Sequence, residues 1–199
     1  EWIGSLAGAG QMHDSGNLST GLDNTSTTFS GVISGTGSLI KVGAGTFTLS
    51  GANSYSGKTV VNGGTLAVTD AGTVGANSLS LLGGMTLDLT GSGGLANAIL
   101  IGGQTNINID TGLAALSGPI ADVGTFEPAG GLTKTGSDTL TLTGSDTYTG
   151  GTHVAGSGTL LVNSSGGTNA STSVTVDTAA TYGGTTSIAT SGTFSASGL

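Results

Sequence analysis

Apolar and polar residues alternate in short runs that recur along the chain. Residues 85–89 and 105–110 alternate with a period of two, which predicts strands that bury one face. Such signals begin at Phe47, Leu66, Leu87, Ile107, Leu140 and Leu160, with gaps of 19, 21, 20, 33 and 20 residues. A spacing near 20 is typical of one coil of a three-sided β-solenoid. We interpret the gap of 33 as one irregular coil.

Glycine separates these runs and argues against helices. The chain has 40 Gly among 199 residues, and each Gly inside a helix costs about 1 kcal/mol relative to Ala. No apolar stripe of helical period is present. We therefore expect an all-β protein, a right-handed parallel β-helix (β-solenoid) with about 20 residues per coil.

A long segment of the chain occurs twice. Lys41 matches Lys134 and Tyr55 matches Tyr148 at an offset of 93 residues, and the lead-in 30–33 resembles 117–120. We call residues 30–68 the first copy and residues 117–162 the second copy. Internal repeats of this kind predict one continuous solenoid over residues 1–199.

Composition excludes several classes of function. Charged residues make up 7% of the chain, the net charge is −8, and Lys41, Lys58 and Lys134 are the only cations. Nucleic-acid binding and docking on anionic lipid both need basic clusters. The chain has no Cys, which excludes disulfides and thiolate metal sites. No apolar run approaches 18 residues, so we expect no direct membrane insertion of this segment.

The sequence offers little for catalysis, and we expect no enzyme, no cofactor and no metal site. The two histidines, His13 and His153, are interpreted as an exposed turn residue and a strand residue. Residues 136–140 fit part of a calcium-binding nonapeptide, but the fragment is not in tandem. The acidic candidates for an alternative function, a polysaccharide-acting β-helix enzyme, are Asp88, Asp110, Asp138, Asp146 and Asp177.

Four residues are candidates for surface contact. Tyr55 and Tyr148 recur at equivalent positions, where they either cap a coil corner or offer a stacking surface for sugars. Asp138 and Asp146 each lie in a Ser-Asp-Thr sequence, where a turn residue that caps its own backbone is the simpler interpretation.

Both copies resemble the autotransporter-associated β-strand repeat of bacterial autotransporter passenger regions. In the first copy the pattern is carried by Lys41, Gly43, Gly45, Thr46, Leu49, Ser50, Gly51, Asn53, Tyr55, Gly57, Thr59, Val61, Gly64 and Leu66. In the second copy it is carried by Lys134, Gly136, Thr139, Leu140, Leu142, Gly144, Tyr148, Gly150, Thr152, Val154 and Leu160. The second copy departs from it at Asp138, Thr143 and Asp146.

The resemblance implies a place and a role for the chain. It implies that residues 1–199 are one segment of a larger passenger, displayed outside a Gram-negative cell, with a C-terminal outer-membrane barrel in the full-length protein. It implies a structural and adhesive role, with host or bacterial surface molecules, or like chains, as partners. A passive stalk or filament-forming segment is the alternative to adhesion, beside the enzyme named above.

Overall fold

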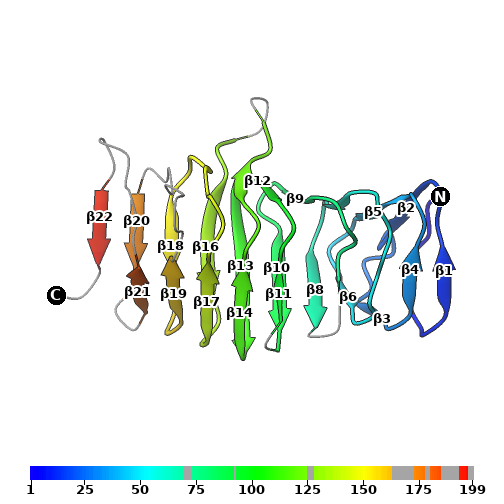
Figure 1. Cartoon of the computed structure of the whole chain (residues 1–199), viewed down its shortest axis with the longest axis horizontal. Helices are drawn as coiled ribbons and strands as arrows, with labels where there is room; N and C mark the ends of the chain where they lie inside the picture. Colours follow the sequence, from blue (N-terminus) through cyan, green and yellow to red (C-terminus); the bar gives the residue numbers. More distant parts are fainter. Residues whose placement is uncertain are drawn as a thin grey trace.

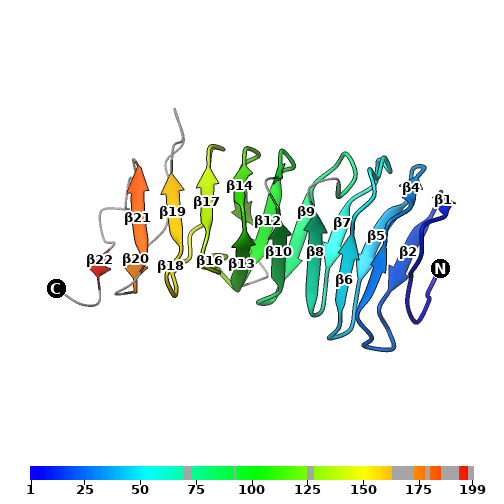
Figure 2. The ribbon, with the colours of Figure 1, turned by 90° about the horizontal axis from the view of Figure 1, so that it is seen from below.

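The chain winds into a rod of stacked coils (Figure 1 and Figure 2). A computed structural model describes residues 1–69, 73–91, 93–124, 128–162, 173–177, 180–184 and 193–196. Strand β1 (Gln11–His13) lies near one end of the rod and β22 (Thr193–Ala196) at the other. The described part of the chain consists of strands and turns and contains no helix, which confirms the expected β-solenoid.

Parallel sheets run along the rod. The nine-stranded sheet contains β3 (Thr27–Phe29), β6 (Thr46–Leu49), β8 (Thr65–Thr69), β10 (Thr86–Thr90), β13 (Gln104–Thr111), β16 (Gly131–Thr135), β18 (Thr152–Val154), β20 (Ser173–Val176) and β22. The six-stranded sheet contains β2 (Asn17–Thr20), β5 (Ser38–Lys41), β7 (Thr59–Val61), β9 (Leu79–Leu82), β12 (Ile99–Gly102) and β15 (Ile120–Asp122). The five-stranded sheet contains β11 (Gly94–Leu95), β14 (Leu113–Leu116), β17 (Thr139–Leu142), β19 (Thr159–Val162) and β21 (Thr181–Gly184). Strand β1 pairs with β4 (Val32–Ser34).

Neighbouring strands in each sheet come from successive coils. In the nine-stranded sheet Phe47 lies beside Leu66, Leu66 beside Leu87, and Leu87 beside Ile107. These partners are about 20 residues apart, as the alternation predicted. Parallel pairing in register satisfies the backbone hydrogen bonds of each coil on the coils before and after it.

One coil is longer than the others, and its place differs from the expectation. Ile107 lies beside Lys134, and Leu140 lies beside Ala114 of the five-stranded sheet. Counted along the nine-stranded sheet, the long coil therefore has 27 residues. The gap of 33 joins strands of two different sheets. The interpretation of that gap as one coil is wrong, because it assumed that equivalent strands stay in one sheet.

Aliphatic side chains stack in columns inside the rod. Under the six-stranded sheet one column contains Leu18, Leu39, Thr59, Leu79, Ile99 and Ile120, all at most 1% exposed. Full burial of an aliphatic side chain of this size contributes about 1.5–3 kcal/mol. The core therefore extends from coil to coil along the rod.

Glycine allows the coils to approach each other at the corners. A Cβ atom on Gly51 would lie 1.9 Å from the carbonyl oxygen of Gly31, and one on Gly144 would lie 2.2 Å from that of Gly118. No side chain fits at such distances, so these turns require glycine.

Candidate functional site

The two repeated lysines are structural and lie inside the coil corners. Lys41 Nζ donates to the carbonyl oxygens of Val42 at 2.7 Å, Gly43 at 2.8 Å and Gly63 at 3.0 Å. Lys134 Nζ donates to those of Thr135 at 2.7 Å and Gly136 at 2.8 Å. Burial lowers the pKa of both ammonium groups. Each lysine thus replaces water as the donor for turn carbonyls.

Around Lys134 two carboxylates oppose the effect of burial. Asp110 and Asp138 act on Lys134 by charge and raise its pKa, against the larger lowering that burial causes. The pKa of Lys41 is lowered by burial, with no such opposing charge. The second copy therefore compensates its buried cation better than the first.

The repeated tyrosines are also internal. Tyr55 is 1% and Tyr148 0% exposed. Their hydroxyls lie 2.6 Å from Thr59 Oγ1 and 2.7 Å from Thr152 Oγ1, respectively, and burial raises the pKa of Tyr55 to about 12. The rings cap coil corners from inside and offer no stacking surface, which corrects the expectation of a surface contact.

The two acidic candidates differ in exposure. Asp146 is 1% exposed, and its Oδ1 accepts a hydrogen bond from the backbone N–H of Ile120 at 2.9 Å. As a surface contact it is therefore corrected in the same way as the tyrosines. Asp138 is half-buried, and its Oδ2 accepts from the N–H of Gly112 at 2.8 Å. Surface contact by Asp138 stays a prediction.

A ladder of polar side chains follows the outside of the nine-stranded sheet. Its members are half-buried neighbours in register, namely Thr46, Thr65, Thr86, Asn106, Thr133, His153 and Thr175. The corresponding column of the six-stranded sheet includes Ile40, Val60 and Leu100 and is less polar. The nine-stranded sheet therefore carries more hydrogen-bonding groups on its outside.

The ladder is hollowed at β16 and β18. The hollow has a volume of about 320 Å³ and is open to solvent. It is lined by Gln104, Thr133, Gly151, Thr152, His153 and Thr175. Gly151 has no side chain to fill this space, whereas the side chain of Gln104 lies over Gly131, its partner in register. We take this hollow as the candidate site.

Side chains in the hollow are held by hydrogen bonds. His153 Nε2 lies 3.0 Å from Asp177 Oδ1, and Asp177 Oδ2 accepts from the N–H of Gly156 at 3.0 Å. The bond to His153 is the first cause that lowers the pKa of Asp177. Gln104 Nε2 donates to Thr133 Oγ1 at 2.7 Å. Amide, hydroxyl and imidazole groups fixed in this way suit uncharged polar ligand groups.

Sequence reasoning missed this site. His153 was correctly predicted in a strand, but its partner Asp177 lies 24 residues away on the next coil. The coil length supplies the missing signal, since a residue about 20 positions on lies beside it. His13, expected in a turn, is exposed at the end of β1.

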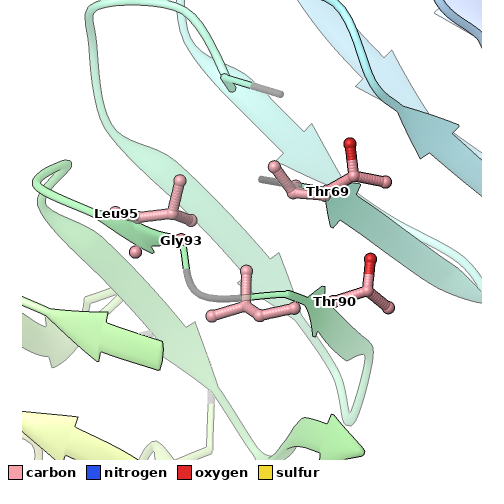
Figure 3. A pocket seen from close by; sticks show the side chains of 7 residues that line it. Thr69, Thr90, Gly93 and Leu95 are labelled. Carbon is pink, nitrogen blue, oxygen red and sulfur yellow. The ribbon is translucent and has the colours of Figure 1, made fainter. Parts of the chain in front are cut away.

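A second cavity is too small to bind a ligand. Figure 3 shows it between β8, β10 and β11, with Thr69, Thr90, Gly93 and Leu95 at its edge. Val68, Leu89 and Gly94 complete the lining, and its volume is about 10 Å³. This space holds at most about one water molecule.

The described residues show neither a metal-binding cluster nor a membrane-spanning helix. Among them, no three His, Asp or Glu side chains are grouped so that they could hold a metal ion. No helix in these parts of the chain is long and apolar enough to span a membrane.

The repeat is also found by comparison with known protein families. The family described as the passenger-associated-transport-repeat matches residues 39–68 and 132–162, one match inside each copy. The chain is 35% identical over 140 residues to a protein named the adhesin BmaC autotransporter of Brucella suis biovar 1 (strain 1330). That match covers 70% of this chain and 4% of the relative, so the chain spans a small part of the relative's length. No solved structure matches. The two repeat copies thus belong to the passenger-associated-transport-repeat family, and 70% of the chain is similar to part of an autotransporter adhesin.

Proposed function

We propose that this chain is a structural and adhesive segment of an extracellular passenger, displayed on the surface of a Gram-negative cell, and that it is not an enzyme. The observation that carries the proposal is the polar ladder on the nine-stranded sheet, from Thr46 to Thr175. A ladder in register presents hydroxyl, amide and imidazole groups at the spacing of strands, about 4.8 Å. Such an array makes many weak contacts at once instead of enclosing one ligand.

The relative supports the same proposal, because its name describes an adhesin. We propose that residues 1–199 form one solenoid segment of a longer passenger, which a C-terminal outer-membrane barrel anchors. Its partners are surface molecules of host or bacterial cells, or like chains. At the hollow, the hydrogen-bonded pair of His153 and Asp177 gives the ladder its most distinct chemistry.

The test compares the second copy with the first. In the first copy Lys58 and Val60 stand where Gly151 and His153 stand in the second. The double variant Gly151→Lys/His153→Val fills the hollow with side chains that the repeat already uses. Beads coated with residues 1–199 are expected to bind host or bacterial cells, and the double variant is expected to bind several-fold fewer.

Controls separate adhesion from other roles. A matched double variant on the six-stranded sheet, Ser80→Ala/Leu100→Ala, is expected to leave binding unchanged. Light scattering across concentrations distinguishes binding to like chains from a monomeric rod. Beads that bind no better than beads coated with an unrelated solenoid would contradict adhesion and favour a passive stalk. Cleavage of a neutral or anionic glycan by the purified chain would contradict the non-enzymatic assignment.

A further inference from the structure

Asn53 and Asp146 occupy the same position in the two copies, at the offset of 93 residues. Asn53 Oδ1 accepts a hydrogen bond from the N–H of Ile33 at 2.8 Å. Asn53 Nδ2 donates to the carbonyl oxygens of Gly51 at 3.0 Å and Thr73 at 2.8 Å. One amide thus ties its own coil to both the preceding and the following coil.

Asp146 reproduces only the accepting half of this arrangement. Its Oδ1 accepts from Ile120 N–H, the counterpart of Ile33 in the lead-in. Its Oδ2 is buried and has no hydrogen-bond partner among the described residues. In the first copy the equivalent atom is Asn53 Nδ2, whose N–H groups donate to carbonyl oxygens. A carboxylate cannot donate there, whereas a carboxylic acid donates one hydrogen bond.

Among the side chains that the structure describes, none is a cation that acts on Asp146. The preceding coil contributes Asp122 of β15, whose carboxylate accepts hydrogen bonds from Gly130 N–H and from Thr149. Tyr148, two residues after Asp146, is hydrogen-bonded through its hydroxyl to Thr152. Residues 163–172, which follow the second copy, contain no titratable side chain. Burial raises the pKa of Asp146 to about 6, and the hydrogen bond from Ile120 opposes this only in part.

We propose that Asp146 is a proton-controlled latch that holds its own coil on β15, closed when its carboxyl group is protonated and loosened when it is ionised. The first copy lacks this control, because the amide of Asn53 donates at every pH. The latch makes the rod locally firmer in mildly acidic surroundings than in neutral ones.

The direction with pH follows from proton linkage. The folded pKa of about 6 lies above the ordinary value of 3.8, so between these values the folded state binds more protons than the unfolded state. The stabilising contribution of Asp146 is therefore fully present below pH 4 and is lost as the pH rises through 6. A pKa raised from 3.8 to about 6 corresponds to a change on the order of a hundredfold in the local unfolding equilibrium.

The test exchanges the two side chains. Asp146→Asn is expected to slow amide hydrogen exchange at Ile120 and Thr147 at pH 7.5 and to remove its excess dependence on pH. Asn53→Asp is expected to bring the same dependence to Ile33 and Ser54, which hold the equivalent places. Asp88→Asn removes an outward-facing, half-buried carboxylate from β10 and controls for the change in net charge.

A direct titration completes the test, and it needs no variant to fold. The carboxyl carbon of Asp146 in the wild-type chain is expected to titrate by NMR near pH 6. A midpoint at or below pH 4 would overturn the latch. So would an Asp146→Asn variant whose exchange at Ile120 keeps the wild-type dependence on pH.

Discussion

The two copies share their internal contacts but lie in different sheets. In both, a lysine donates to turn carbonyls and a tyrosine hydroxyl meets a threonine hydroxyl four residues on. Strands β5 to β8 of the first copy lie in the six- and nine-stranded sheets, whereas the equivalent strands β16 to β19 of the second copy lie in the nine- and five-stranded sheets. Contacts within a repeat are therefore set by its own residues, and its orientation is set by the length of the coil that precedes it.

Replacing the corner glycine of either copy should cause the largest loss of stability. Gly51→Ala and Gly144→Ala should each destabilise the rod by about 2–4 kcal/mol, because the added Cβ would meet a backbone carbonyl of the preceding coil. Urea unfolding with local hydrogen exchange measures this. Gly10→Ala, with no atom within 4 Å of the new Cβ, should change stability by less than about 0.5 kcal/mol. Equal losses in all three variants would contradict the close approach.

Replacing the buried lysine should destabilise the second copy more than the first. Lys41→Met and Lys134→Met each remove the buried donor to turn carbonyls and should cost about 1–3 kcal/mol. Lys134→Met should cost more than Lys41→Met, since it also leaves Asp110 and Asp138 without their cation. Urea unfolding at low and high salt measures the difference, which salt should reduce. A larger loss from Lys41→Met would argue against this role of the two carboxylates.

Removing the buried tyrosine hydroxyl should destabilise the two copies by the same amount. Tyr55→Phe and Tyr148→Phe keep the buried ring and remove one hydrogen bond to threonine, at a cost of about 1 kcal/mol each. The loss of stability in the double variant should equal the sum of the losses in the two single variants, because the two sites share no residue. Strong coupling between them in a double-mutant cycle would show that the corners do not act independently.

His153→Val should have the smallest effect on stability. It places the residue of the first copy, Val60, into a partly exposed strand position, so stability should change by less than about 0.5 kcal/mol. The pKa of Asp177 should rise toward its ordinary value, because the hydrogen bond from His153 that lowers it is lost. NMR titration of the Asp177 carboxyl group measures this. An unchanged pKa would show that Gly156 N–H alone accounts for the effect.

Much of the fold could be predicted because its signals are local. Alternation in the runs at Phe47, Leu66 and Leu87 gives both the strands and the coil length, since each residue pairs with one about 20 positions away. The change of sheet in the second copy could not be predicted. It depends on how many residues the corner between β15 and β16 contains, and alternation says nothing about corners.

The candidate site was predicted less well, for two physical reasons. Tyr55, Tyr148 and Asp146 lie in corner segments without regular alternation, so the sequence does not tell which of their side chains point inward. The pair of His153 and Asp177 forms only between adjacent coils. Detecting it requires the register as well as the strand, because His153 pairs with Thr175 in register and Asp177 lies two residues beyond that partner.

The displaced second copy also limits how the rod can be held. Two identical binding groups, one on each copy, would point in different directions around the axis, because their strands belong to different sheets. A single flat membrane could then engage one of them but not both, and the gain in avidity from two linked sites would be lost. A partner that wraps around the rod, or several small partners that bind separately, could still occupy both groups.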